Sequence, residues 1–169
     1  MPEKETIERA RQDEQKGKAP STQAGEFVRE EIHHIREGKH GARSPQQAIA
    51  IGLSKARRAG VKLAAPKKGK ASARTRAQAQ RDLRKGKAAR RQKPSTTRSR
   101  AISRALKREG RNAASRKALA RQAHRSAQTR GRASRHQAAV KAVRTKGKTG
   151  LRIAGRKAAR TRASHRKAA

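Results

Sequence analysis

The stretch from Ser44 to Gly60, SPQQAIAIGLSKARRAG, carries a start signal, an apolar face and a stop signal for one helix. Ser44 is a good N-cap, and Pro45 suits the first helical position because the N–H that it lacks would have no partner there. Gln47, three residues after the cap, can reach back to complete a capping box. Ile49, Leu53 and Ala56 share one face, basic residues fill the last turn, and Gly60 suits a left-handed stop. The stretch therefore predicts a capped amphipathic helix.

The residues before this helix predict a second amphipathic helix against which it can pack. Residues 23–37 carry Ala24, Phe27, Val28, Ile32 and Ile35 on one broad face. Ser21 or Thr22 is the expected N-cap, and Gly38 the expected stop. We expect a helical hairpin over residues 21–63, called the head, with Val61 and Leu63 folding back over it. Its expected core residues are Phe27, Val28, Ile32, Ile35, Ile49 and Leu53. Residues 1–20 predict a polar helix, from Glu3 to Lys16, and a linker.

Charge divides the chain into two parts. The 169 residues carry 49 Lys and Arg against 11 Asp and Glu, a net charge of +38. Residues 1–63 have a net charge of +4, whereas residues 64–169, called the tail, have +34, with Asp82 and Glu109 as their only acids. High net charge and few large apolar residues are typical of disordered chains. The expected fold is mostly α, with the helical head followed by a largely disordered, low-complexity tail.

The tail is nevertheless rich in Ala and Arg, which are among the best helix formers. Like charges at i, i+3 and i, i+4, such as Arg100 with Arg104 and Lys107, oppose the helix. We therefore expect the tail to be conditionally helical, gaining helix when phosphates neutralise it. An imperfect repeat of glycine, base, serine and an Ala-rich segment occurs at residues 36–50, 108–120 and 131–140; biased composition could equally produce it by chance.

The segment from Glu26 to Lys70 resembles a family of small basic bacterial proteins catalogued as a domain of unknown function. The pieces that match are the glycine after the first helix, the capped SPQQAIAI segment and the switch to a Lys/Arg/Ala tail. This resemblance covers about a quarter of the chain and implies no established activity. The tail also resembles those of histone H1-like bacterial proteins, although it is richer in Arg (23) than in Lys (13).

The basic tail predicts binding to nucleic acid through phosphates, driven by counterion release. The tail has no aromatic side chain on which bases could stack, which favours duplex DNA over single strands. No recognition helix is evident, so we expect binding without sequence specificity. The expected contact residues on and just after the capped helix are Arg57, Arg58, Lys67, Lys68 and Lys70. Those further along the tail are Arg90, Arg91, Lys93, Arg98, Arg100, Arg104, Lys107, Arg108, Arg156, Lys157, Arg160, Arg162, Arg166 and Lys167.

No metal or catalytic site is expected. His33, His34 and His40 cluster, but adjacent histidines point about 100° apart on a helix, which favours solvent-facing side chains. The Gly147-Lys148-Thr149 segment lacks the earlier glycine of a P-loop. No nucleophile–base pair is evident, and the chain has no cysteine. We expect neither an enzyme nor a cofactor.

The sequence thus predicts a nucleoid-associated, histone-like protein of the bacterial cytoplasm that condenses duplex DNA. An RNA-binding or ribosome-associated protein is the first alternative, because its electrostatics would be the same. The second is a plasmid-maintenance or antitoxin-type protein whose head binds a protein partner or itself. A membrane is not an expected partner, because the scattered apolar residues form no stripe.

Overall fold

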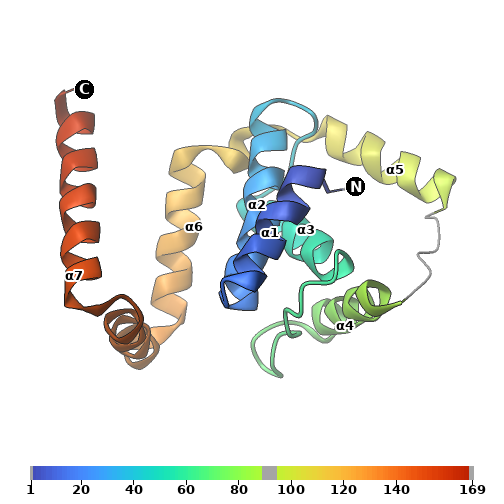
Figure 1. Cartoon of the computed structure of the whole chain (residues 1–169). Coiled ribbons are helices and arrows are strands. Elements are labelled where there is room, and N and C mark those ends of the chain that lie inside the picture. Colours follow the sequence, from blue (N-terminus) through green and yellow to red (C-terminus); the bar gives the residue numbers. More distant parts are fainter. Residues whose placement is uncertain (1, 89–94, 168–169) are drawn as a thin grey trace. The chain divides into compact units, whose positions relative to one another are not determined.

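The computed structural model describes residues 2–88 and 95–167, with side chains up to residue 164. Within these residues the regular structure is helical, with no strand, so the expected mostly-α class is confirmed (Figure 1). The elements in order are α1 (Lys4–Gln15), α2 (Pro20–Arg36), α3 (Pro45–Arg58), α4 (Ala73–Lys87), α5 (Thr96–Arg108), the 3₁₀ turn η1 (Asn112–Ala114), α6 (Arg116–Thr129) and α7 (Gly131–Lys167).

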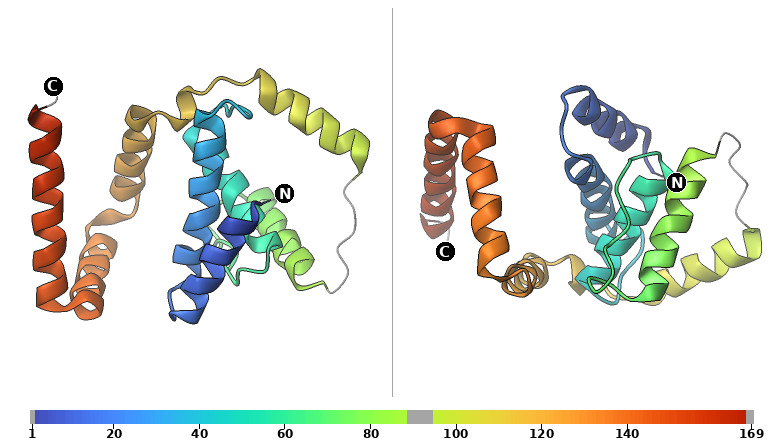
Figure 2. Two further views of the ribbon diagram at one scale, coloured as in Figure 1. Left: turned by 45° about the horizontal axis from the view of Figure 1, so that its top comes forward. Right: turned by 90° about the horizontal axis from the view of Figure 1, so that it is seen from below.

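The chain forms two compact units, Met1–Gln122 and Ala123–Ala169. In the first unit α2 is central: α1 and α3 pack against it, and α4 packs against α3 (Figures 1 and 2). The second unit consists of the end of α6 and α7. The expected division at residue 64 therefore does not coincide with the boundary between the compact units.

Helix α3 has the expected caps at both ends. The Ser44 hydroxyl accepts a hydrogen bond from the Gln47 amide at 3.2 Å. The Gln47 side chain reaches back one residue further than a capping box requires, accepting from the Arg43 amide at 2.8 Å. At the other end Gly60 has φ of +106°, and Val61 N–H donates to the Ala56 carbonyl. This pattern is a Schellman motif, and it turns Val61 back onto the core.

The expectation that Ser21 or Thr22 caps the start of α2 is wrong. The helix begins at Pro20, and the residue before it, Ala19, makes no side-chain cap. Proline at the first helical position needs no partner for an N–H, which allows the helix to start without a polar cap. The expected polar helix of residues 3–16 is present as α1.

Two apolar clusters form the core of the first unit. Of the six expected core residues, Phe27, Ile32 and Ile35 are buried, while Val28 and Leu53 are partly buried and pack against the clusters. Ile49 is partly buried and belongs to neither cluster. One cluster comprises Ile32, Ile35, Ala42, Ala48, Ala113 and Ala114. The other comprises Ala10, Ala24, Phe27, Ala56 and Val61.

Helix α3 packs against α2 through small residues rather than through Ile49. Ala48, Gly52 and Ala56 are buried at i, i+4 spacing. A Cβ atom on Gly52 would lie 2.7 Å from Val28 Cα and 3.0 Å from the Phe27 carbonyl oxygen. The backbones of α2 and α3 therefore approach more closely than any side chain at position 52 permits.

The Gly52→Ala substitution is expected to lower the free energy of unfolding by about 1–3 kcal/mol, because overpacking forces the two helices apart. Gly25→Ala is the matched control, since Gly25 lies in α2 and a Cβ atom added to it would meet nothing within 4 Å. The Gly25→Ala variant should raise the free energy of unfolding by about 0.5–1 kcal/mol through helix propensity alone. Urea denaturation followed by circular dichroism measures both. Stabilisation by both variants would refute the close approach.

Two of the three repeat copies lie against each other. Gly41 N–H donates to the Leu106 carbonyl, and Ala42 N–H donates to the Gly110 carbonyl. Ser115 caps α6 through the Ala118 amide at 3.2 Å, as Ser44 caps α3. The third copy, residues 131–140, lies entirely within α7, so its serine is inside a helix and does not precede one. The second copy brings Ala113 and Ala114 into the core of the head.

The expected largely disordered tail is wrong for the described residues, which form α4 to α7. Helix α4 belongs to the folded unit, because Ala79 and Asp82 are buried and Ser54 donates to Asp82 at 2.7 Å. Helices α5 and α6 bury no residue. There the high helix propensity of Ala and Arg, with the Ser95 and Ser115 caps, outweighs like-charge repulsion.

Candidate nucleic-acid interface

Helix α5 presents a basic stripe on one side. Arg100, Arg104, Lys107 and Arg108 are all exposed, and their spacing places them within about 100° of the helix circumference. Ile102, on the opposite side, is 55% exposed. The stripe makes no ion pair within the described part of the chain. It offers four cations to an anionic surface without unpairing any of them.

Helix α7 carries a longer basic row. Lys148, Arg152, Arg156 and Arg160 follow one another at i, i+4 spacing, so a cation recurs about every 6 Å along the axis. The row begins directly after Gly147, where φ is +64° and the helix is kinked. No acidic residue follows Glu109 in the sequence. The row is exposed, and among the described side chains none of its members has a carboxylate partner.

The sequence-based prediction included Arg156 and Arg160 of this row but missed Lys148 and Arg152. The regular spacing of four was the signal that would have found them. Dense clusters of Arg and Lys do not reveal a row whose members are separated by three residues. On a helix, however, it is this spacing that aligns side chains on one side.

Most other expected contact residues are exposed. Arg98 lies in α5 away from the stripe, and Lys157 and Arg162 lie in α7 beside the row. Lys67, Lys68 and Lys70 lie in the connection between α3 and α4. Arg90, Arg91 and Lys93 fall outside the described residues, as do the side chains of Arg166 and Lys167 in the last turn of α7.

Arg57 is not a phosphate contact, which corrects the expectation. Its residue is only 8% exposed, and its guanidinium donates to the carbonyls of Leu63 at 3.1 Å and Ala64 at 3.4 Å. Burial lowers the pKa of Arg57, against the opposing attraction of Asp82. Its role is to hold the segment after α3 against the helix. Arg58 is exposed, with its Nε 3.7 Å from Asp82 Oδ1.

Several cations of the first 63 residues pair with acids of the same segment. Arg9 donates to Glu26 at 2.9 Å, and Lys18 donates to Asp13 at 2.7 Å. Hydrogen bonds from Lys39 to Glu37 and to Glu3 raise the pKa of Lys39. Acids of this part of the chain thus hold several of its cations, whereas no acid pairs with the basic stripe of α5 or the basic row of α7 among the described residues.

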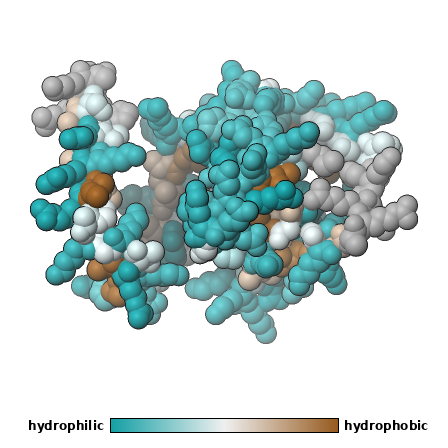
Figure 3. Space-filling view, viewed as in Figure 1, coloured by the Kyte–Doolittle hydropathy of each residue, from teal (hydrophilic) through white to brown (hydrophobic). Residues whose placement is uncertain are grey.

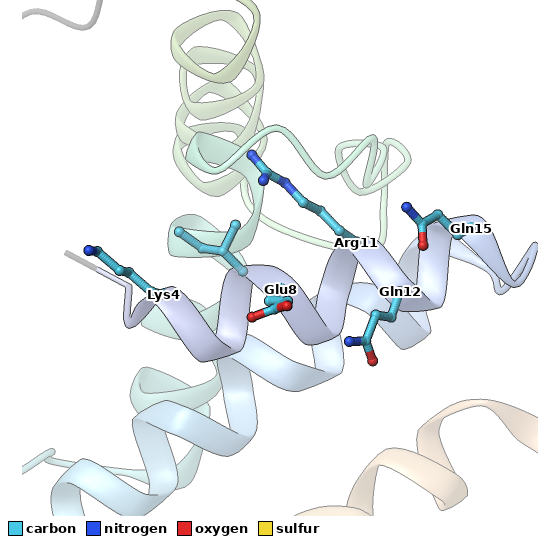
Figure 4. A pocket seen from close by; sticks show the side chains of 6 residues that line it. Lys4, Glu8, Arg11, Gln12 and Gln15 are labelled. Atoms are coloured by element: carbon cyan, nitrogen blue, oxygen red, sulfur yellow. The ribbon is translucent and has the colours of Figure 1, made fainter.

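The remaining surface includes one open hollow beside α1. The pocket in Figure 4 is an open hollow along one face of α1, lined by Lys4, Ile7, Glu8, Arg11, Gln12 and Gln15. The face in Figure 3 is mostly hydrophilic, with hydrophobic side chains in separate spots. None of the described helices combines the length and the hydropathy needed to cross a bilayer.

Comparisons of the chain with protein-family models, with curated proteins and with solved structures gave no match. Its own residues are therefore the guide to its function.

Proposed function

We propose that the chain binds duplex DNA through its phosphates, without reading base sequence, and that it condenses or bridges DNA in the manner of a histone-like nucleoid protein. The observation that carries this proposal is the unpaired basic row of α7, in a segment that contains no acid. Each cation that neutralises a phosphate releases condensed counterions, which drives binding. Arginine adds bidentate hydrogen bonds to phosphate oxygens.

Duplex DNA is favoured over single strands because the chain has no exposed platform for stacking. Phe27 is its only Phe, Tyr or Trp residue, and it is 1% exposed in the core. Readers of single strands depend on such side chains. Contacts with the backbone remain as the source of affinity, and these carry no sequence information.

Helix stability and DNA binding are expected to be coupled. Helix α5 buries no side chain, so its stability rests mainly on helix propensity and capping, whereas α6 also packs Leu119 against the core. Arg100 repels Arg104 across one helical turn, and Arg104 repels Arg108 across the next. Neutralisation by phosphates removes this repulsion and lowers the free energy of the helical state.

RNA binding remains the main alternative, because its phosphates would attract the same cations. An exposed apolar face on residues 27–35 would favour the alternative of a protein-binding head. Phe27, Ile32 and Ile35 are instead buried against neighbouring helices. The proposal therefore keeps nucleic acid as the partner and the nucleoid as the location.

Fluorescence anisotropy with duplex DNA across a salt series tests the proposal. We expect equal affinity for two unrelated DNA sequences, and a linear fall of log K with log salt at about −0.9 per phosphate contacted. Duplex RNA and single-stranded DNA of equal length serve as competitors. Affinity that is indifferent to salt, or a clear preference for RNA, would overturn the proposal.

A further inference from the structure

The end of α2 and the turn that follows it bring together Glu31, His34 and His40. One potential ligand atom from each residue lies within 4.8 Å of the others. The Glu31 side chain is 1% exposed, and those of His34 and His40 are 12% and 17% exposed. The expectation that these two histidines face solvent is therefore wrong, and it holds only for His33.

His40 points a lone pair at a carboxylate. Its Nδ1 lies 3.1 Å from the Gly41 carbonyl oxygen, which can only accept, so Nδ1 carries the proton. In a neutral ring Nε2 is then an acceptor, and it lies 3.2 Å from Glu31 Oε1. Both carboxylate oxygens of Glu31 are buried without a hydrogen-bond partner within the described residues. Two acceptors that face each other at this distance repel, and either a metal ion between them or a second proton on His40 would relieve the repulsion.

His34 is held in a similar way by an outer carboxylate. Its Nε2 lies 2.8 Å from Glu3 Oε1, so Nε2 donates and Nδ1 keeps the lone pair. Nδ1 is 3.9 Å from Glu30 Oε1, too far for a hydrogen bond. The two imidazole rings are nearly perpendicular, with centroids 6.2 Å apart. Histidines that bind metals typically have this arrangement, in which the second ring nitrogen donates to a carboxylate or a backbone carbonyl.

The buried charges around the cluster do not balance. Lys55 Nζ lies 2.6 Å from Glu31 Oε2 and 3.4 Å from Glu30 Oε1, so one ammonium faces two buried carboxylates. Lys55 leaves Glu31 Oε1 free on the side of His40. With both histidines neutral, one negative charge stays uncompensated in the interior, where charge is costly.

We propose that Glu31, His34 and His40 bind a divalent transition-metal ion of the Zn²⁺ class. Two imidazoles and one carboxylate are a donor set that zinc accepts, with a fourth position left for water. Bonds of about 2.0–2.1 Å in a tetrahedron place ligand atoms about 3.3 Å apart. The 3.2 Å between Glu31 Oε1 and His40 Nε2 already matches this separation.

The ion would join α2 to the turn that leads into α3. That turn also hydrogen-bonds the end of α5, through Gly41 to Leu106 and Ala42 to Gly110. Metal binding would therefore stabilise the segment from which the basic stripe of α5 projects. The inference does not depend on DNA binding, because the ligands belong to the folded first unit.

The test uses the full chain, stripped with a chelator and titrated with Zn²⁺ by calorimetry. We expect one ion per chain and a rise in melting temperature. The His34→Ala and His40→Ala variants should lose this binding. The Glu3→Gln variant, which changes the outer partner that His34 shares with Lys39, should weaken it about 10–100-fold.

His33→Ala is the matched control, because His33 is the exposed neighbour of His34 on the same helix. It should bind Zn²⁺ as the unsubstituted chain does. Circular dichroism of the metal-free variants checks that each one folds. Equal losses in His33→Ala and His34→Ala would mean adventitious binding by surface histidines and would overturn the proposal. So would a chain that binds no Zn²⁺ and instead holds a proton on both nitrogens of His40, seen by nitrogen NMR.

Discussion

Replacing Lys148, Arg152, Arg156 and Arg160 together by glutamine is expected to weaken binding to duplex DNA by up to about 10³-fold near 0.1 M salt. Four lost phosphate contacts would reduce the slope of log K against log salt by about 3.6. Glutamine keeps most of the side-chain length and helix propensity, so α7 should remain helical. Anisotropy titrations at several salt concentrations measure the affinity and the slope.

A control with the same loss of charge is available in the first unit. Lys4, Arg11, Lys16 and Lys62 are exposed residues of the near-neutral part of the chain, and their replacement by glutamine removes the same four charges. If the row on α7 contacts phosphates, the control should keep nearly the full salt slope. Equal losses in the two variants would show that net charge alone, and not the row, determines affinity.

The Lys55→Met substitution is expected to lower the free energy of unfolding by about 3–5 kcal/mol. Removing one partner of a buried ion pair leaves an uncompensated charge in the interior. Here two carboxylates, each 1% exposed, would lose the ammonium between them. Urea denaturation in the presence of a chelator measures the change without any contribution from metal.

Lys62→Met is the control for this substitution. Lys62 pairs with Glu14 at 3.7 Å, and both side chains are mostly exposed. Exposed pairs contribute at most about 1 kcal/mol. Adding Glu30→Gln and Glu31→Gln to Lys55→Met should recover stability, because it removes the stranded charges. A Lys55→Met variant as stable as Lys62→Met would contradict the buried ion cluster.

Local signals in the sequence predicted local structure well. The two ends of α3 were correctly predicted from Ser44, Pro45 and Gly60, because capping residues act within one helical turn. The segment from Glu3 to Lys16 was correctly expected to be helical. In the tail, however, net charge was given more weight than helix propensity. Charge determines whether a chain collapses, whereas helix formation depends on neighbours three and four residues away.

The core and the sites depended on contacts between segments distant in sequence. Ala113 and Ala114 lie in the core of the head because the second repeat copy pairs with the first. Arg57 resembled a phosphate contact, because its sequence neighbours do not reveal the carbonyls that hold it. The cluster of Glu31, His34 and His40 was not predicted, because the turn after α2 brings His40 back to Glu31.

The helical class, the caps of α3 and the concentration of cations without acids after Glu109 can all be read from the sequence. Each follows from residues within a few positions of one another, or from composition alone. Which helix faces are buried, which arginine holds the fold together and which histidines lie beside a carboxylate depend on how the helices pack. Helix packing brings such groups together in space, and their separation along the chain carries no record of it.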